Sequence, residues 1–209
     1  MNLYNAIYGF IAMIFLLVMS LSSAAAQSST AVAANLTEQD KTDLKQVETY
    51  LESITTLQSK FLQVSSNGGV ASGNLFMSRP GKIRFEYDPP ESILMVADGL
   101  FLVYIDKDLE QTTHVLLKST PAYFLVREDI QLSGDITVTR VERSPGILRL
   151  TVQDTDEPEK GSITLTFTVQ PLTLRKWTVI DAQNIKTEIT LTNQETGMIL
   201  DPSLFEYNP

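Results

Sequence analysis

The side chains that could carry out catalysis are few in this 209-residue chain. The sequence has one histidine, His114, in the strand-like run Thr-Thr-His-Val-Leu, and no cysteine. One histidine leaves a Ser-His-Asp triad open, but no nucleophile-elbow sequence accompanies it. We therefore expect His114 to be an exposed strand residue and the chain not to be an enzyme.

Two acidic clusters are candidates for metal binding. Asp106, Asp108 and Glu110 form the first, and the second lies in segment 154–159. The first cluster lacks the ligand pattern of a calcium loop, and both have the composition of solvated hairpin turns. No glycine-rich phosphate loop is present. We expect neither a metal site nor a cofactor.

One cation occupies a position that packing does not readily explain. A strand is interrupted at Arg79-Pro80-Gly81, resumes with strict alternation over Lys82–Tyr87 and ends before Pro89-Pro90. A charge at such a break is hard to account for as part of a core. The simplest interpretation of Arg79 is a surface ion pair.

The first 26 residues have the composition of a signal peptide. Ile7–Met19 is almost wholly apolar but shorter than the roughly 20 residues of a membrane span. Small residues at Ser23–Ala26 predict cleavage after Ala26. Residues 1–26 contain no Lys or Arg, which departs from the usual plan of a signal peptide. An uncleaved anchor is the alternative. No cysteine follows the apolar run, so lipidation of this chain is not expected.

The mature chain has the length of one domain with a sizeable core, which we place at 36–209 after a disordered segment 27–35. Its formal net charge is -9. An acidic surface argues against nucleic acid as a partner, and against tight electrostatic adsorption to anionic lipid.

The hydrophobic periodicity predicts a helix, several strands, a short helix and further strands. Thr37 can cap a long amphipathic helix that reaches about Gln58. Thr120 and Pro121 can begin a short helix ending near Val126. Strands are expected at Phe61–Val64, Val70–Met77, Lys82–Tyr87, Ile93–Val96, Leu100–Ile105, Thr112–Leu117, Ile136–Glu142, Ile147–Gln153, Ile163–Val169, Leu174–Asp181 and Lys186–Leu191.

Hairpin-sized spacing between these strands indicates one strongly curved antiparallel sheet that closes or nearly closes a barrel. The two helices are the candidates to cover its apolar face. Phe76-Met77, Ile93–Val96 and Leu100–Ile105 are apolar on both faces, so these strands need cover on two sides. Apolar residues on both faces of these strands are consistent with an ordinary core covered by helices and also with an apolar cavity between sheet and helices.

An ordered set of motifs along the mature chain resembles the LolA family of periplasmic lipoprotein carriers. The motifs are Phe61-Leu62-Gln63, Arg79-Pro80-Gly81, Phe85–Pro90, Asp98-Gly99, Pro121–Leu125 and Phe205. Phe85 and the region of Val103 depart from the family, which often has tryptophan there. The strands around Trp177 match only loosely.

The resemblance implies a mainly β fold with α: an incomplete, strongly curved antiparallel barrel of ten or eleven strands, covered by a lid. The lid would comprise the long N-terminal helix and short helices. In the family, the arginine of Arg-Pro-Gly closes the lid, and Arg79 matches it; its five donors suit contact with several helix carbonyls. Candidate cavity residues are Leu44, Val47, Leu51, Ile54, Phe76, Met77, Phe85, Met95, Phe101, Tyr123, Phe124 and Leu125.

The resemblance also implies a monomer in the periplasm with acylated lipoproteins as cargo. Its partners would be an inner-membrane ABC-type release complex and an outer-membrane receptor lipoprotein, with transient contact at the membrane surface. A lipid- or lipoprotein-sensing regulator on the same fold, which binds without delivery, is the alternative function. An enzyme is a third class, and the absence of a lipidated cysteine argues against a receptor.

Overall fold

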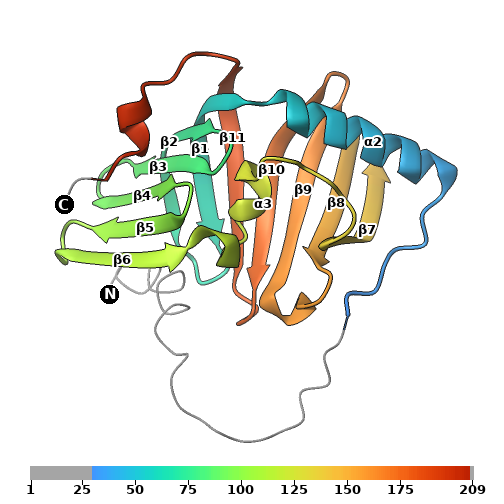
Figure 1. Ribbon diagram of the computed structural model, residues 1–209, viewed down its shortest axis with the longest axis horizontal. Coiled ribbons are helices and arrows are strands. Elements are labelled where there is room, and N and C mark those ends of the chain that lie inside the picture. Colours follow the sequence, from blue (N-terminus) through green and yellow to red (C-terminus); the bar gives the residue numbers. More distant parts are fainter. Residues whose placement is uncertain (1–29, 208–209) are drawn as a thin grey trace, which may run out of the picture.

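The computed structural model describes residues 30–207. They form an eleven-stranded antiparallel sheet with few helices, which confirms the mainly β fold class (Figure 1). The strands are β1 (Thr56–Ser65), β2 (Val70–Ser78), β3 (Lys82–Tyr87), β4 (Ile93–Asp98), β5 (Phe101–Asp106), β6 (Gln111–Leu116), β7 (Ile136–Ser144), β8 (Ile147–Asp154), β9 (Gly161–Val169), β10 (Leu172–Asp181) and β11 (Lys186–Thr196).

The sheet is open, with β6 and β7 at its two edges. Its strand order is β6-β5-β4-β3-β2-β1-β11-β10-β9-β8-β7, so consecutive strands pair, except β6 with β7. In addition, β1 pairs with β11 and so joins two meanders into one sheet. The segment between β6 and β7 therefore connects the two edges.

The long helix α2 (Glu38–Ser53) begins as the sequence predicts. Thr37 and Asp40 form a capping box, in which each side chain accepts a hydrogen bond from the other residue's backbone N–H. The helix was predicted to reach about Gln58, and this is wrong, because β1 already begins at Thr56. Ile54, Thr55 and Thr56 are all β-branched, which favours the extended strand over another helical turn.

The second helix, α3 (Tyr123–Val126), follows a 3-10 turn η2 (Leu117–Ser119). Thr120 does not cap it: the residue before the helix is Ala122, and the Thr120 hydroxyl donates to the Leu117 carbonyl at 2.8 Å. In Figure 1, α2 runs across β7 to β10 and α3 lies against the middle of the sheet. We call the face toward α2 and α3 the inner face.

The outer face of β3 to β6 is covered by the end of the chain, which Figure 1 shows returning across the molecule. A 3-10 turn, η4 (Pro202–Phe205), lies against β3 and β4, and the Phe205 side chain is only 3% exposed. Arg84 Nη1 donates to the Leu204 carbonyl at 2.9 Å. This segment explains why β4 and β5 are apolar on both faces.

The N-terminal boundary differs from the prediction. Segment 27–35 was expected to be disordered, but Ala34 N donates to the Val138 carbonyl and Ala31 N to the Thr155 carbonyl, both at 2.9 Å. The predicted signal peptide 1–26 and residues 27–29 lie outside the described residues. Within residues 30–207, no helix is long and apolar enough to span a membrane.

Candidate functional site

Arg79 joins the sheet to the end of α2. Its Nε donates to the Ile54 carbonyl at 2.7 Å, and its Nη2 donates to the Leu51 carbonyl. These carbonyls belong to the last turn of the helix and the residue after it, where backbone acceptors lack the usual partner four residues on. The Leu51 carbonyl also accepts from Ile54 N at 3.2 Å. A cation there also interacts favourably with the negative end of the helix dipole.

The third nitrogen of this guanidinium is not satisfied. Arg79 Nη1 is buried, and no hydrogen-bond acceptor reaches it among residues 30–207. Burial lowers the pKa of Arg79 below its usual value, against the opposing charge of Glu52. A buried donor without a partner costs about 1–3 kcal/mol, which offsets part of the stabilisation from the two bonds it does make.

The same turn also contacts α3. Gly81 N donates to the Val126 carbonyl at 2.6 Å. Gly81 has φ +79°, and a Cβ there would lie 2.7 Å from the Gly99 Cα. Glycine therefore permits both the left-handed backbone and the close approach of the Asp98-Gly99 turn. The Arg-Pro-Gly motif thus contacts both helices: its arginine bonds to carbonyls at the end of α2, and its glycine bonds to the last carbonyl of α3.

Beneath this contact the inner face holds a small apolar cavity of about 20 Å³. Its walls come from the end of α2, from the sheet and from the α3 region. They are Leu51, Ile54, Leu57, Leu75, Met77, Ile83, Leu125, Ile130, Leu174 and Trp177. Such a volume accommodates about one water-sized group. An acyl chain therefore fits only if part of the cover moves.

A larger groove of about 690 Å³ lies outside, along the exposed side of α2. Polar and charged side chains predominate among the residues that line it: Glu38, Lys41, Thr42, Lys45, Gln46, Thr49, Tyr50 and Ser53. The groove is open to solvent, and it does not enclose a hydrocarbon chain.

Most of the predicted cavity residues share the inner core. Of these, Leu51, Ile54, Met77 and Leu125 line the cavity. The others in the buried core are Leu44, Val47, Phe85, Met95 and Phe124, with Tyr123 partly buried against them. The Phe85 ring packs edge-on against Trp177 at a centroid distance of 6.5 Å.

Phe76 and Phe101 are exceptions, and their assignment to the cavity is wrong. Phe76 pairs with Arg84 on the outer face, while its neighbours Leu75 and Met77 point inward. The Phe101 ring contacts His114 on the outer face, while Leu102 joins the inner core. Successive strand residues alternate faces, so an apolar pair such as Phe76-Met77 does not by itself reveal which one is inside.

Six cavity residues were not predicted: Leu57, Leu75, Ile83, Ile130, Leu174 and Trp177. The sequence could have indicated two of them. Leu75 lies two residues from Met77, and Ile83 two residues from Phe85, so each shares a strand face with a predicted cavity residue. Ile130 lies in a loop, where no periodicity marks it. Leu57, Leu174 and Trp177 lie on β1 and β10, which come to the cavity because both strands pair with β11.

The remaining candidates for chemistry lie away from this cavity. His114 is exposed, as predicted, with its ring 6.3 Å from those of Phe101 and Tyr207. Asp106 accepts backbone hydrogen bonds from Asp108 and Leu109, as expected of a residue that stabilises a hairpin turn.

Comparison of the sequence with known proteins shows its family. The family model "Outer membrane lipoprotein carrier protein LolA" matches residues 52–208. An outer-membrane lipoprotein carrier protein of Nitrosomonas europaea is 31% identical, over 79% of this chain and 84% of that protein. One of Methylococcus capsulatus is 28% identical, over 81% and 85%. A solved LolA superfamily structure from Nitrosomonas europaea superposes with a TM-score of 0.47 at 9% identity, over 78% of this chain and 97% of that chain.

Proposed function

Because this chain belongs to the LolA family of outer membrane lipoprotein carrier proteins, we propose that it carries lipoproteins through the periplasm. In this proposal the inner apolar core shields the acyl chains of the cargo. Each methylene left in water costs about 0.8 kcal/mol, so an acylated protein cannot cross an aqueous space unaided. A carrier function needs no catalytic group.

The observation that carries the proposal is the contact of Arg79 with the last carbonyls of α2, above the apolar cavity. We assign Arg79 the role of holding the cover closed when no cargo is bound. A carrier must also release its cargo, which requires open and closed states of similar energy. The unsatisfied Nη1 of Arg79 raises the energy of the closed state and so supports a reversible contact.

The proposed partners follow from the direction of transport. The carrier, a monomer, takes lipoproteins from an inner-membrane ABC-type release complex and passes them to the outer membrane, directly or through a receptor lipoprotein. The names of the relatives, outer-membrane lipoprotein carrier proteins, support this direction. The net charge of -9 supports only brief contact with anionic membranes along the way.

The test is transfer of a labelled lipoprotein with wild-type protein, Arg79→Leu and Arg140→Leu. Leucine at position 79 removes the closing contact without making a core cavity, so we expect a folded protein that loads cargo but releases it at least tenfold more slowly. Arg140 is a matched control, because it lies on β7 with 67% of its side chain exposed. Normal transfer by Arg79→Leu would exclude the closing role.

The carrier function itself is tested by mass spectrometry of protein purified from its native periplasm without detergent. A bound triacylated lipoprotein is the expected result. Empty protein that also fails to release lipoprotein from inner-membrane vesicles, with their donor complex energised, would favour a sensor that binds without delivery.

A further inference from the structure

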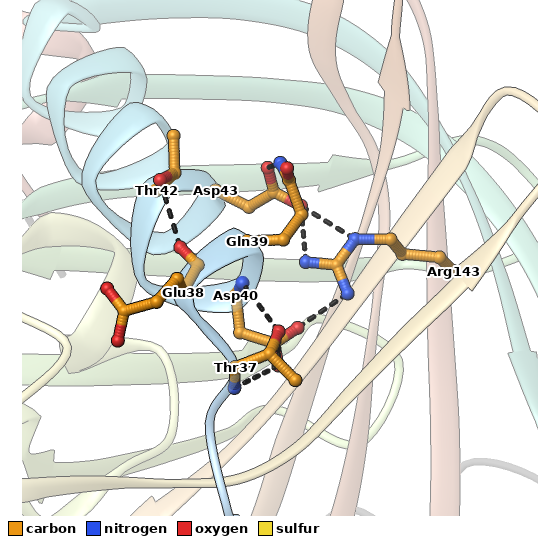
Figure 2. A network of polar contacts seen from close by, with 7 residues as sticks. All are labelled: Thr37, Glu38, Gln39, Asp40, Thr42, Asp43 and Arg143. Carbon is orange, nitrogen blue, oxygen red and sulfur yellow. Dashed lines mark hydrogen bonds and ion pairs between the residues drawn. The ribbon is translucent and has the colours of Figure 1, made fainter.

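The beginning of α2 has its own attachment to the sheet, through Arg143 at the end of β7. Its Nη1 donates to Asp40 Oδ1 at 2.5 Å. Its Nη2 and Nε both donate to Asp43 Oδ2, at 2.6 and 2.8 Å. Figure 2 shows the guanidinium held between the two carboxylates of the first helical turns.

This contact is better organised than an ordinary surface ion pair. The Asp40 side chain is only 9% exposed and also accepts hydrogen bonds from the Thr37 backbone and hydroxyl, at 2.7 and 2.6 Å. All three guanidinium nitrogens of Arg143 have a carboxylate partner. A planar guanidinium shared by two ordered carboxylates is among the stronger hydrogen-bonding arrangements in proteins.

Further contacts hold the middle of α2. The Tyr50 hydroxyl accepts from Leu174 N in β10 at 3.0 Å. Glu48 Oε1 accepts from Leu132 N at 2.7 Å, but Leu132 belongs to the segment that carries α3 and not to the sheet. Asp40 and Leu51 are eleven residues apart, or about 16 Å along a helix. Arg143 and Leu174 therefore attach α2 to the sheet at its beginning and near its end, and loss of the Arg79 contact leaves both attachments in place.

The segment Leu117–Asp135, which carries α3, is held differently. Its buried residues are apolar: Leu117, Phe124, Leu125, Val126, Ile130 and Leu132. The ion pair of Arg127 with Asp135 lies within the segment. Its bonds to the β2–β3 turn and to α2 use its backbone: Gly81 N donates to the Val126 carbonyl, and Leu132 N donates to Glu48. The segment joins edge strands β6 and β7, so it bridges the opening of the sheet. Its apolar side chains occupy space on the inner face that acyl chains could take at little change in buried apolar area.

We propose that Arg143 is a positioning residue that fixes α2 as a stationary wall of the cavity, so that cargo is admitted by displacement of segment Leu117–Asp135. This inference rests on the proposed carrier function. It assigns the two covering helices different roles: α2 stays on the sheet while α3 leaves it.

The experiment uses pairs of spin labels in the full mature chain, which has no cysteine of its own. Exposed positions serve: Lys45→Cys on α2, Glu128→Cys in the α3 segment and Thr192→Cys on β11 as the reference. Distances are measured with and without a synthetic triacylated lipopeptide. We expect the 128–192 distance to change by at least about one helical turn, ~5 Å, and the 45–192 distance to stay constant.

Variants then test Arg143 directly. In Arg143→Ala we expect the 45–192 distance to broaden and shift when lipopeptide binds, while the control Arg140→Ala behaves as wild type. Asp43→Asn, which weakens the same contact more mildly, serves if Arg143→Ala does not fold. Movement of α2 in the wild type equal to that of α3, or an unchanged 45–192 distance in the variants that fold, would overturn the inference.

The outcomes separate this inference from the function on which it rests. If the wild-type protein binds no lipopeptide by native mass spectrometry, the carrier proposal fails and the inference fails with it. If it binds lipopeptide but α2 moves with α3, the carrier function stands and only the stationary role of α2 is wrong.

Discussion

Two arginines hold opposite ends of the same helix, but with different partners. Arg79 binds neutral carbonyls at the C-terminal end of α2, whereas Arg143 binds two carboxylates in its first turns. The helix dipole favours the Arg79 cation near the last turn, and near the first turn it favours the carboxylates that Arg143 binds. Arg143 also gains the attraction between opposite charges, whereas Arg79 bonds neutral carbonyls and leaves Nη1 unsatisfied, so the Arg79 end is the easier one to release.

The network at Asp40 makes a prediction about acid stability. Hydrogen bonds from Thr37 first, and from Arg143 next, lower the pKa of Asp40 from 3.8 to about 2. Because the folded-state pKa lies below the unfolded one, this stabilisation is present above about pH 4 and is lost as the pH falls toward 2. Thr37→Val should lose about 1 kcal/mol at neutral pH and show a shallower loss of stability below pH 4.

Urea unfolding at several pH values checks this. Thr42→Val is the matched control, because its exposed hydroxyl donates only to the Glu38 carbonyl within the helix. If Thr37→Val and the wild type lose stability equally between about pH 4 and pH 2, the capping network does not set the pKa of Asp40.

At the scale of elements, the turn between β2 and β3 is the point where both covering helices meet the sheet. Gly81→Ala should therefore be more damaging than a typical turn substitution, because a Cβ would meet the Gly99 Cα at 2.7 Å in addition to the strain of φ +79°. We expect a loss of about 2 kcal/mol or more, measured by thermal or urea unfolding.

Gly146→Ala is the control for this prediction. Its φ of +75° is nearly the same, but no atom lies within 4 Å of the position of a Cβ. It should cost only the backbone strain of about 1 kcal/mol. Equal losses of unfolding free energy in the two variants would mean that the turn at Gly99 can move away from a Cβ at position 81 without destabilising the protein.

For the whole molecule, the open sheet leaves one gap, and the connection between its edges crosses that gap. The inner face is thus closed by a segment of the chain, whereas its outer face over β3 to β6 is closed by the C-terminal turn with Phe205. One cover is apolar and lies over the cavity. The other adds a charge-assisted bond from Arg84 and buries Phe205, which suits a permanent cover.

The overall charge predicts weak adsorption to membranes. At a net charge of -9 the protein should bind anionic vesicles less than zwitterionic ones at low salt, and added salt should reduce the difference. Co-sedimentation with the two kinds of vesicle measures this. Strong binding to anionic vesicles that salt abolishes would show that a local basic surface outweighs the net charge.

Local patterns in the sequence predicted the elements well. The capping residue Thr37, the alternation over Lys82–Tyr87 and the turn at Asp98-Gly99 each depend on residues a few positions apart, and the structure has the expected element at each place. The ordered motifs likewise indicated the family that the comparisons show. The predicted end of α2, near Gln58, was wrong because the apolar spacing of the helix continues to Leu57, whereas the β-branched residues Ile54–Thr56 favour a strand.

By itself, then, the sequence determined the elements, the antiparallel class and the family, since short-range periodicity and turn chemistry encode them. Only the tertiary structure decided which face of each strand is inside, because alternation with a period of two does not distinguish Leu75 and Met77 from Phe76. It alone also brought Arg143 to Asp40, 103 residues away in the sequence. Such contacts depend on the pairing of β1 with β11 and on the curvature of the sheet, which no local pattern records.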